Sequence, residues 1–246
     1  MDSCYRTIFK RYELKYMLDR MQYAEVRSAM ENHMKPDEYG ESTVCSLYFD
    51  TPNKQIIRSS LERPIYKEKL RLRSYGIAGN DTDVFAELKK KYEGVVYKRR
   101  ETMKYRDAAS YLFDRNRPIN PTQITNEIDY FISFYKGLEP SMLLIYDRTA
   151  FFGKDDDGFR ITFDKNIRWR DTELCLSSGL YGNSLTGENE VLMEVKAGDS
   201  IPLWLAETLS ENRIFKTSFS KYGSAYIESL KKENEFITKE RLNYCA

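Results

Sequence analysis

The chain has 246 residues, with 39 lysines and arginines against 38 aspartates and glutamates, and its formal net charge is +1. This balance excludes a protein that binds nucleic acid through bulk positive charge, so any excess of cations must be local. The length supports a sizeable core and the 14% aromatic content favours strands, and we expect a single domain over residues 1–246.

Strand patterns dominate the first half of the chain. Alternation predicts strands over residues 11–17, 42–50, 66–73, 84–91 and 95–104. Asp19 is placed to cap a helix that runs to about Met34, and a short helix through Ile56, Ile57 and Leu61 precedes the third strand. A turn at residues 92–94 joins the last two strands as a hairpin.

Helices and strands mix in the second half. Helices are predicted over residues 107–115 and 121–136, from Pro202 onward, and over 221–231. Strands are predicted over residues 142–152, 159–164 with an extension at 167–170, and 190–196, the last after a loop at 177–188. Hairpins with helices between and after them indicate an α+β domain built on an antiparallel sheet.

The four cysteines are widely spaced and form no C-x-x-C pair, which argues against a zinc site and favours reduced thiols. No apolar run is long enough to span a bilayer, and the N-terminus lacks the apolar segment of a signal peptide. We therefore expect a cytoplasmic protein with no membrane segment of its own.

The most informative strand is the one over residues 66–73. Lys67, Lys69, Arg71 and Arg73 alternate along it, so a pleated backbone places all four on one face. Such a row repels itself unless water or a polyanion neutralises it. Charged alternation recurs on nearly every predicted strand, which is typical either of a solvated sheet face or of a surface that binds an anion.

Phosphate chemistry suits these residue types. Arginine and lysine clamp phosphate oxygens, and a carboxylate can hold Mg²⁺ or Mn²⁺ that bridges the same phosphates. If the strands closed into a barrel with the charged faces inward, the lumen would be a cationic cradle that excludes water. Phosphoryl transfer in such a cradle requires mainly positioning and charge stabilisation.

Eight short segments, taken in order, match a known family. They are RYELKY at 11–16, SLYFDT at 46–51, KLRLRSYG at 69–76, FAELK at 85–89, YDRTAF at 146–151, RITFD at 160–164, LMEVK at 192–196 and FSKY at 219–222. The ordered set resembles the VTC domain, the polyphosphate polymerase module of the triphosphate tunnel metalloenzyme (CYTH-like) superfamily. The resemblance implies an antiparallel eight-stranded β tunnel, a closed barrel, with helices packed outside.

The same resemblance implies an activity and its residues. The activity is transfer of the terminal phosphate of ATP to a polyphosphate chain, with Mn²⁺ or Mg²⁺, and Glu194 is the implied metal ligand. The implied catalytic cations are Lys15, Arg71, Arg73, Lys89, Arg148 and Arg160. The implied substrate-binding cations are Lys98, Lys221 and Lys216, the last with its direction, lumen or solvent, left open. Glu13 and Glu87 are either further metal contacts or structural partners of neighbouring cations.

Departures from the family pattern leave alternatives. The hydrolytic branch of the superfamily opens with E-x-E-x-K, and here Arg11 stands in place of the first acid, which favours a polymerase over a triphosphatase. A non-enzymatic polyphosphate-binding module is a further alternative. Nucleic acid is not an expected partner, because Tyr66 and Tyr75 are explained by strand packing. The membrane helices of the fungal polymerase subunits have no counterpart here, so coupling to a membrane would require a separate membrane partner.

Overall fold

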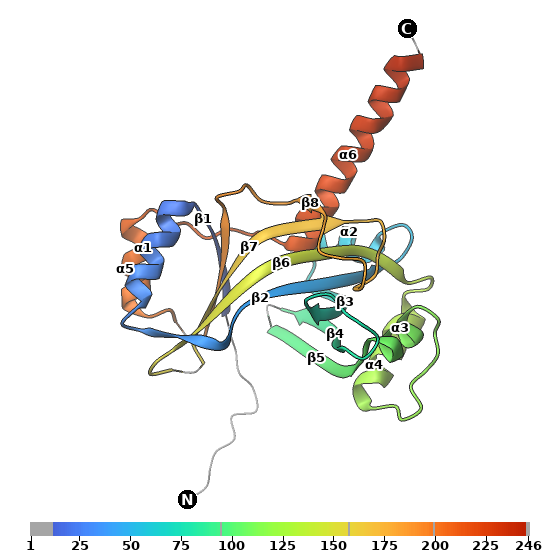
Figure 1. Ribbon diagram of the computed structural model, residues 1–246, viewed down its shortest axis with the longest axis horizontal. Helices are drawn as coiled ribbons and strands as arrows, with labels where there is room; N and C mark the ends of the chain where they lie inside the picture. Colours follow the sequence, from blue (N-terminus) through green and yellow to red (C-terminus); the bar gives the residue numbers. More distant parts are fainter. Residues whose placement is uncertain (1–11, 94, 157, 199, 245–246) are drawn as a thin grey trace, which may run out of the picture. The chain divides into compact units, whose positions relative to one another are not determined.

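The computed structural model describes residues 12–93, 95–156, 158–198 and 200–244, which contain six helices (Figure 1). The helices are α1 Arg20–Met30, α2 Gln55–Leu61, α3 Tyr105–Leu112, α4 Gln123–Phe134, α5 Leu203–Glu211 and α6 Lys221–Tyr244. The strands are β1 Tyr12–Leu18, β2 Met34–Asp50, β3 Tyr66–Tyr75, β4 Asp83–Tyr92, β5 Val95–Lys104, β6 Glu139–Gly153, β7 Arg160–Arg170, β8 Asn183–Ser184 and β9 Val191–Ala197.

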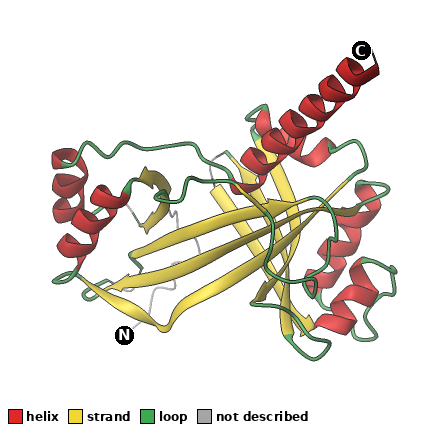
Figure 2. Ribbon diagram, turned by 45° about the horizontal axis from the view of Figure 1, so that its top comes forward, coloured by secondary structure: helices red, strands yellow, loops and turns green. Residues whose placement is uncertain are grey.

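The strands belong to one large sheet, which confirms the α+β class (Figure 2). Their order is β1-β9-β7-β6-β2-β3-β4-β5, and β8 pairs with β7 outside this path. The pairs β1 with β9, β9 with β7, and β2 through β5 in succession are antiparallel.

The expected closed barrel is not formed by hydrogen bonds between the described strands, since the path ends at β1 and β5. Closure requires every strand to have a neighbour on both sides. On its side away from β9, β1 pairs instead with a short segment that precedes α6, because Tyr16 bridges to Lys216 and the Thr217 N–H donates to the Lys15 carbonyl at 2.7 Å.

The chain divides into two compact units, and each contains discontinuous segments. The first unit comprises residues 1–42, 147–166 and 186–219, and the second comprises residues 43–146, 167–185 and 220–246. The strands β2, β6 and β7 each contribute residues to both units. A single domain over residues 1–246 stays a prediction.

The core of the first unit lies on one face of β1, β9 and β7. Tyr16, Met193 and Phe163 are register partners and are buried together with Val26 of α1 and Leu205 of α5. Alternate residues of the same strands point to the opposite face. On β1 and β9 that face carries charged residues, among them the register partners Lys15 and Glu194.

The second unit has the same division between faces. Leu70 and Leu88 are register partners on β3 and β4, and they are fully buried in a core that includes Tyr111 of α3 and both Ile128 and Phe131 of α4. The cations predicted to share a face of β3 therefore lie on the side of the strands away from this core.

Several elements differ from the predicted boundaries. The helix capped by Asp19, whose Oδ1 accepts from the Gln22 N–H at 2.8 Å, ends at Met30, because β2 starts at Met34. The strand β2, a neighbour of β6 in the sheet, continues through Pro36 and Gly40, residues that disfavour a strand by themselves. The last helix continues to Tyr244, and the two-residue strand β8 was not predicted.

In the described part of the chain, no helix combines the length and the apolarity that a bilayer crossing requires.

Candidate functional site

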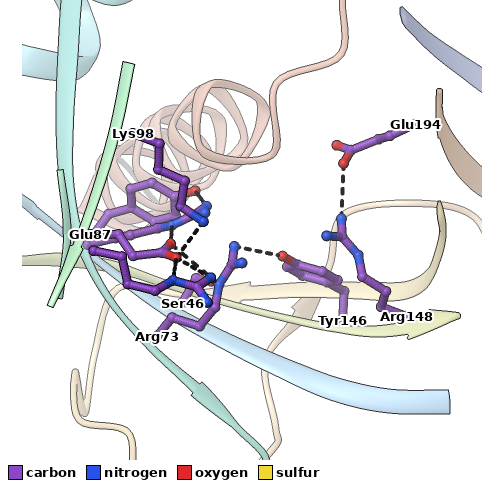
Figure 3. Close-up of polar contacts among 10 residues, drawn as sticks. Ser46, Arg73, Glu87, Lys98, Tyr146, Arg148 and Glu194 are labelled. Atoms are coloured by element: carbon purple, nitrogen blue, oxygen red, sulfur yellow. Dashed lines mark hydrogen bonds and ion pairs between the residues drawn. The ribbon is translucent and has the colours of Figure 1, made fainter. Parts of the chain in front are cut away.

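The register of the β3, β4 and β5 strands surrounds one glutamate with cations. Glu87 lies opposite Arg71 on β3 and Arg100 on β5. Its carboxylate lies 2.6 Å from Arg71 Nε, 2.6 Å from Lys98 Nζ and 2.6 Å from Arg100 Nη2, and Arg73 Nε is 3.8 Å away (Figure 3). We call these five residues the Glu87 cluster.

Glu87 remains a carboxylate in this environment. Its side chain is only 1% exposed, and burial by itself raises its pKa. The charges of Arg71, Arg73 and Lys98 outweigh burial and hold the pKa of Glu87 well below its ordinary range. The cluster therefore opposes one carboxylate to four cations, and its positive charge is only partly neutralised. Glu87 acts as the structural partner of cations, which was one of its two predicted roles.

Two tyrosines and a serine hold the arginines of the Glu87 cluster. Arg71 Nη1 donates to Tyr48 Oη at 3.0 Å, while Arg73 donates to Tyr146 Oη and Ser46 Oγ, both at 3.3 Å (Figure 3). Our reading of the sequence missed these three residues. The sequence did contain one sign of them, because Ser46 and Tyr48 alternate and therefore share one face of β2. In the structure their register partners are Arg73 and Arg71.

The start of α6 brings a further predicted cation to the same residues. Lys221 Nζ lies 4.8 Å from the centre of the Tyr146 ring, and the Tyr222 ring stacks on Tyr48 at 4.6 Å. The Tyr222 hydroxyl donates to buried Asp50 at 2.9 Å, which anchors the helix. Lys89, also predicted, lies on β4 opposite Lys69 of β3 and Lys98 of β5.

The first unit carries a second charged group, centred on Glu194. The register places Glu194 between Lys15 on β1 and Thr162 on β7. Glu194 Oε1 lies 3.2 Å from Lys15 Nζ. Glu194 Oε2 accepts from Arg148 Nη2 at 3.0 Å (Figure 3). Arg148 also binds Asp164 through two bonds of 2.6 and 2.7 Å. We call Glu194, Lys15, Arg148 and Asp164 the Glu194 cluster.

The carboxylates of this unit fit only one kind of metal site. Among the described residues, no three His, Cys, Asp or Glu side chains gather to hold a metal ion. Asp164 is engaged by Arg148, and Glu13 lies 3.6 Å from Lys15 Nζ. Each oxygen of Glu194 contacts a cation, Lys15 or Arg148. Since Mg²⁺ is often held by one or two carboxylates together with substrate phosphates and water, Glu194 fits an ion that bridges to phosphate and does not fit an all-protein cage.

Two predicted cations of the first unit, Arg160 and Lys216, contact other parts of that unit. Arg160 Nη2 is 3.6 Å from Asp37 Oδ2, and its guanidinium lies 4.8 Å from the centre of the Phe152 ring. Lys216 is exposed, and its backbone pairs with Tyr16. Whether the Lys216 side chain reaches the lumen or solvent stays a prediction.

Binding of triphosphate, the ligand that the family resemblance implies, is expected to weaken as the pH rises through about 8. Burial raises the pKa of Tyr48, but Arg71, Lys69 and Arg73 outweigh it and lower the pKa to about 8. Burial lowers the pKa of Lys98 to about 8, against the opposing effect of Glu87. Above that pH Tyr48 gains a negative charge beside Arg71 and Lys98 loses its positive charge, so both changes disfavour an anion.

Calorimetry with inorganic triphosphate between pH 7 and 9.5 measures this loss. Tyr48→Phe should make the loss shallower, whereas Tyr97→Phe, which changes an exposed tyrosine of β5, should reproduce the native profile. Identical profiles for Tyr48→Phe and the native protein would show that Tyr48 does not titrate next to the bound anion.

Comparisons with known proteins give a family and a fold. The family model of the VTC domain matches residues 10–230. A candidate adenylate cyclase from Bacillus halodurans is similar in structure, with a TM-score of 0.54 and 15% identity over 85% of this chain and 92% of that chain. A candidate adenylyl cyclase from Hippeastrum that has a dominant triphosphatase activity gives a TM-score of 0.53 and 14% identity over 88% of this chain and 95% of that chain. A comparison with curated protein sequences found no match.

Proposed function

Because the chain belongs to the VTC domain family, we propose that it is a metal-dependent polyphosphate polymerase of the cytoplasm. Its substrates are ATP and a polyphosphate chain, and its product is a chain one phosphate longer together with ADP. The bond between the γ-phosphorus of ATP and the β,γ-bridging oxygen breaks, and a bond forms from that phosphorus to a terminal oxygen of the chain.

The observation that carries the proposal is the Glu87 cluster. Four cations converge there on one buried carboxylate, and Tyr48 and Tyr146 hold two of the arginines in place. Preorganised guanidinium groups bind phosphate oxygens without further rearrangement. Phosphoryl transfer depends on such positioning and charge stabilisation and needs no covalent intermediate with the protein.

The roles follow from the contacts. Arg71 and Arg73 bind and orient the triphosphate, and Lys98 and Lys221 add charge beside them. Lys89, Arg148, Arg160 and Lys15 are assigned to the transferring phosphate and the growing chain by the family resemblance. Glu194 would hold the divalent cation, Mn²⁺ or Mg²⁺, which neutralises phosphate charge when bound. Lys15 and Arg148 orient the Glu194 carboxylate for that purpose.

The alternative is a triphosphatase of the same superfamily. The cation at Arg11, in place of the first acid of the hydrolytic pattern, supports the polymerase, although Arg11 lies outside the residues that the structure describes. A hydrolase must also activate water, which requires more carboxylate than the single Glu194 offers to a metal ion.

Incubation of the purified protein with ATP and Mn²⁺ tests the proposal. The expected products are ADP and long anionic chains that an exopolyphosphatase degrades, and both should disappear when the metal is chelated. Release of inorganic phosphate without polymer would establish the hydrolase instead. Tight binding of polyphosphate without any turnover would leave a binding module.

A further inference from the structure

A buried hydroxyl group beside the Glu194 cluster has no hydrogen-bond partner among the described residues. The hydroxyl belongs to Thr162 on β7, a residue that is only 2% exposed. A buried polar atom without a partner costs stability, and native proteins contain few such atoms. The position of Thr162 in the sheet identifies the group with which its hydroxyl can pair.

The strand register places Thr162 directly opposite Glu194 of β9. Side chains at directly opposite positions of an antiparallel pair share one face, and their Cβ atoms are about 4.5–5.5 Å apart. The neighbours of Thr162 along the strand, Ile161 and Phe163, are fully buried in the core on the other face. The Thr162 hydroxyl is therefore within reach of the Glu194 carboxylate.

The contacts that orient the Glu194 carboxylate are both made by positively charged groups. Lys15 Nζ lies 3.2 Å from Oε1, and Arg148 Nη2 donates to Oε2 at 3.0 Å (Figure 3). A divalent cation that binds one of these oxygens is repelled by the charged group already on it, so that contact must lengthen. The carboxylate then loses one of its two orienting contacts, and a donor without charge is needed in its place.

We propose that Thr162 is a positioning residue for the metal site, whose hydroxyl donates a hydrogen bond to the Glu194 carboxylate when a divalent cation displaces Lys15 or Arg148. The inference rests on the proposed function, because that function assigns the cation to Glu194. Carboxylates that bind metal ions are themselves held by hydrogen bonds from neighbouring groups, and these bonds raise the affinity for the metal. The proposal also explains why this buried position carries threonine, where the isosteric valine would avoid an unpaired polar atom.

Binding of two probes to the full chain tests the role of Thr162 without turnover. The probes are the complex of Mn²⁺ with inorganic triphosphate, and triphosphate alone in the presence of a chelator. Thr162→Val removes the hydroxyl but keeps the shape of the side chain, and it should weaken binding of the complex roughly tenfold. Thr162→Ser keeps the hydroxyl and should stay within about threefold of the native affinity. Both variants should bind triphosphate alone as the native chain does.

Thr208→Val is the matched control. Thr208 of α5 is also buried in the first unit, but its hydroxyl donates to the Trp204 carbonyl at 2.7 Å. This control should bind the Mn²⁺–triphosphate complex with native affinity and should be less stable in denaturant unfolding, because it loses a hydrogen bond. Thr162→Val, unfolded without metal, should be at least as stable as the native chain. The same substitution is thus expected to affect binding at one position and stability at the other.

Three results would overturn the positioning role. Native affinity of Thr162→Val for the Mn²⁺–triphosphate complex would show that the hydroxyl does not act on the metal site. An equal loss for Thr162→Val and Thr162→Ser would assign the effect to packing of the side chain. A loss of stability in Thr162→Val without metal would show that the hydroxyl has a structural partner.

The same measurements separate the positioning role from the proposed function. If Thr162→Val binds the Mn²⁺–triphosphate complex more weakly but the native chain makes no polymer from ATP, the positioning role of Thr162 stands and the polymerase falls. Polymer synthesis by the native chain, together with native affinity of Thr162→Val for the complex, gives the reverse result.

Discussion

Replacement of both Arg71 and Arg73 by alanine is expected to weaken triphosphate binding at least about a hundredfold. Each arginine offers a charge-assisted contact of about 1.5–3 kcal/mol, and both are held in position by tyrosines. Isothermal calorimetry with inorganic triphosphate measures the effect. Unchanged affinity would mean that the Glu87 cluster does not bind the substrate.

The same double variant is expected to lose stability, because Glu87 loses two of its partners while it is almost fully buried. Lys98 and Arg100 stay in contact with it, so we expect a loss of about 2–4 kcal/mol in the free energy of unfolding. Adding Glu87→Gln should restore part of this stability without restoring triphosphate affinity. That triple variant separates loss of binding from loss of folding.

A single change, Arg106→Ala, is the control for the loss of an arginine. Arg106 belongs to α3 and pairs with Asp81, which lies just before β4. The Arg106 side chain is 61% exposed. Exposed ion pairs contribute little to stability. The control should therefore match the native protein both in denaturant unfolding and in triphosphate binding.

The second large effect is expected for Glu194→Gln, which should reduce turnover at least about a hundredfold because the metal ion loses its protein ligand. Triphosphate affinity should stay equal or increase, since Lys15 and Arg148 no longer face a negative charge. Folding should be little affected, because Arg148 keeps both of its bonds to Asp164. Titration with Mn²⁺ in the presence of triphosphate gives a readout that does not depend on turnover.

Glu207→Gln, an identical change at an exposed position of α5, is the control and should have native turnover. Retention of turnover within a few-fold by Glu194→Gln would exclude Glu194 as the metal ligand. Loss of turnover, triphosphate binding and thermal stability together would give Glu194 a structural role between its two cations.

These experiments address the chemistry that distinguishes the proposed activities. In the proposed site, the polymerase and the hydrolase both require triphosphate binding at Arg71 and Arg73 and a metal ion at Glu194, whereas a binding module requires only the cations.

Local alternation allowed much of the sheet to be predicted from the sequence. The positions of Lys67, Lys69, Arg71 and Arg73 on one face follow from the two-residue period of a strand, and the β3 strand has that arrangement. Capping by Asp19 and the hairpin of β4 and β5 are likewise determined by neighbouring residues. The ordered family segments depend on the sequence alone as well, and the match over residues 10–230 confirms the family.

The partners of these side chains were decided only by the tertiary structure. The contacts of Arg73 with Tyr146 and of Arg148 with Glu194 join residues that are 73 and 46 positions apart. Such pairs depend on strand register, and register depends on packing across the sheet, which the alternation of one strand does not specify. Closure of the barrel was not confirmed, because the side of β1 away from β9 pairs with the segment at Lys216. A period of two residues selects the face of a side chain, whereas pairing between distant segments selects its neighbour.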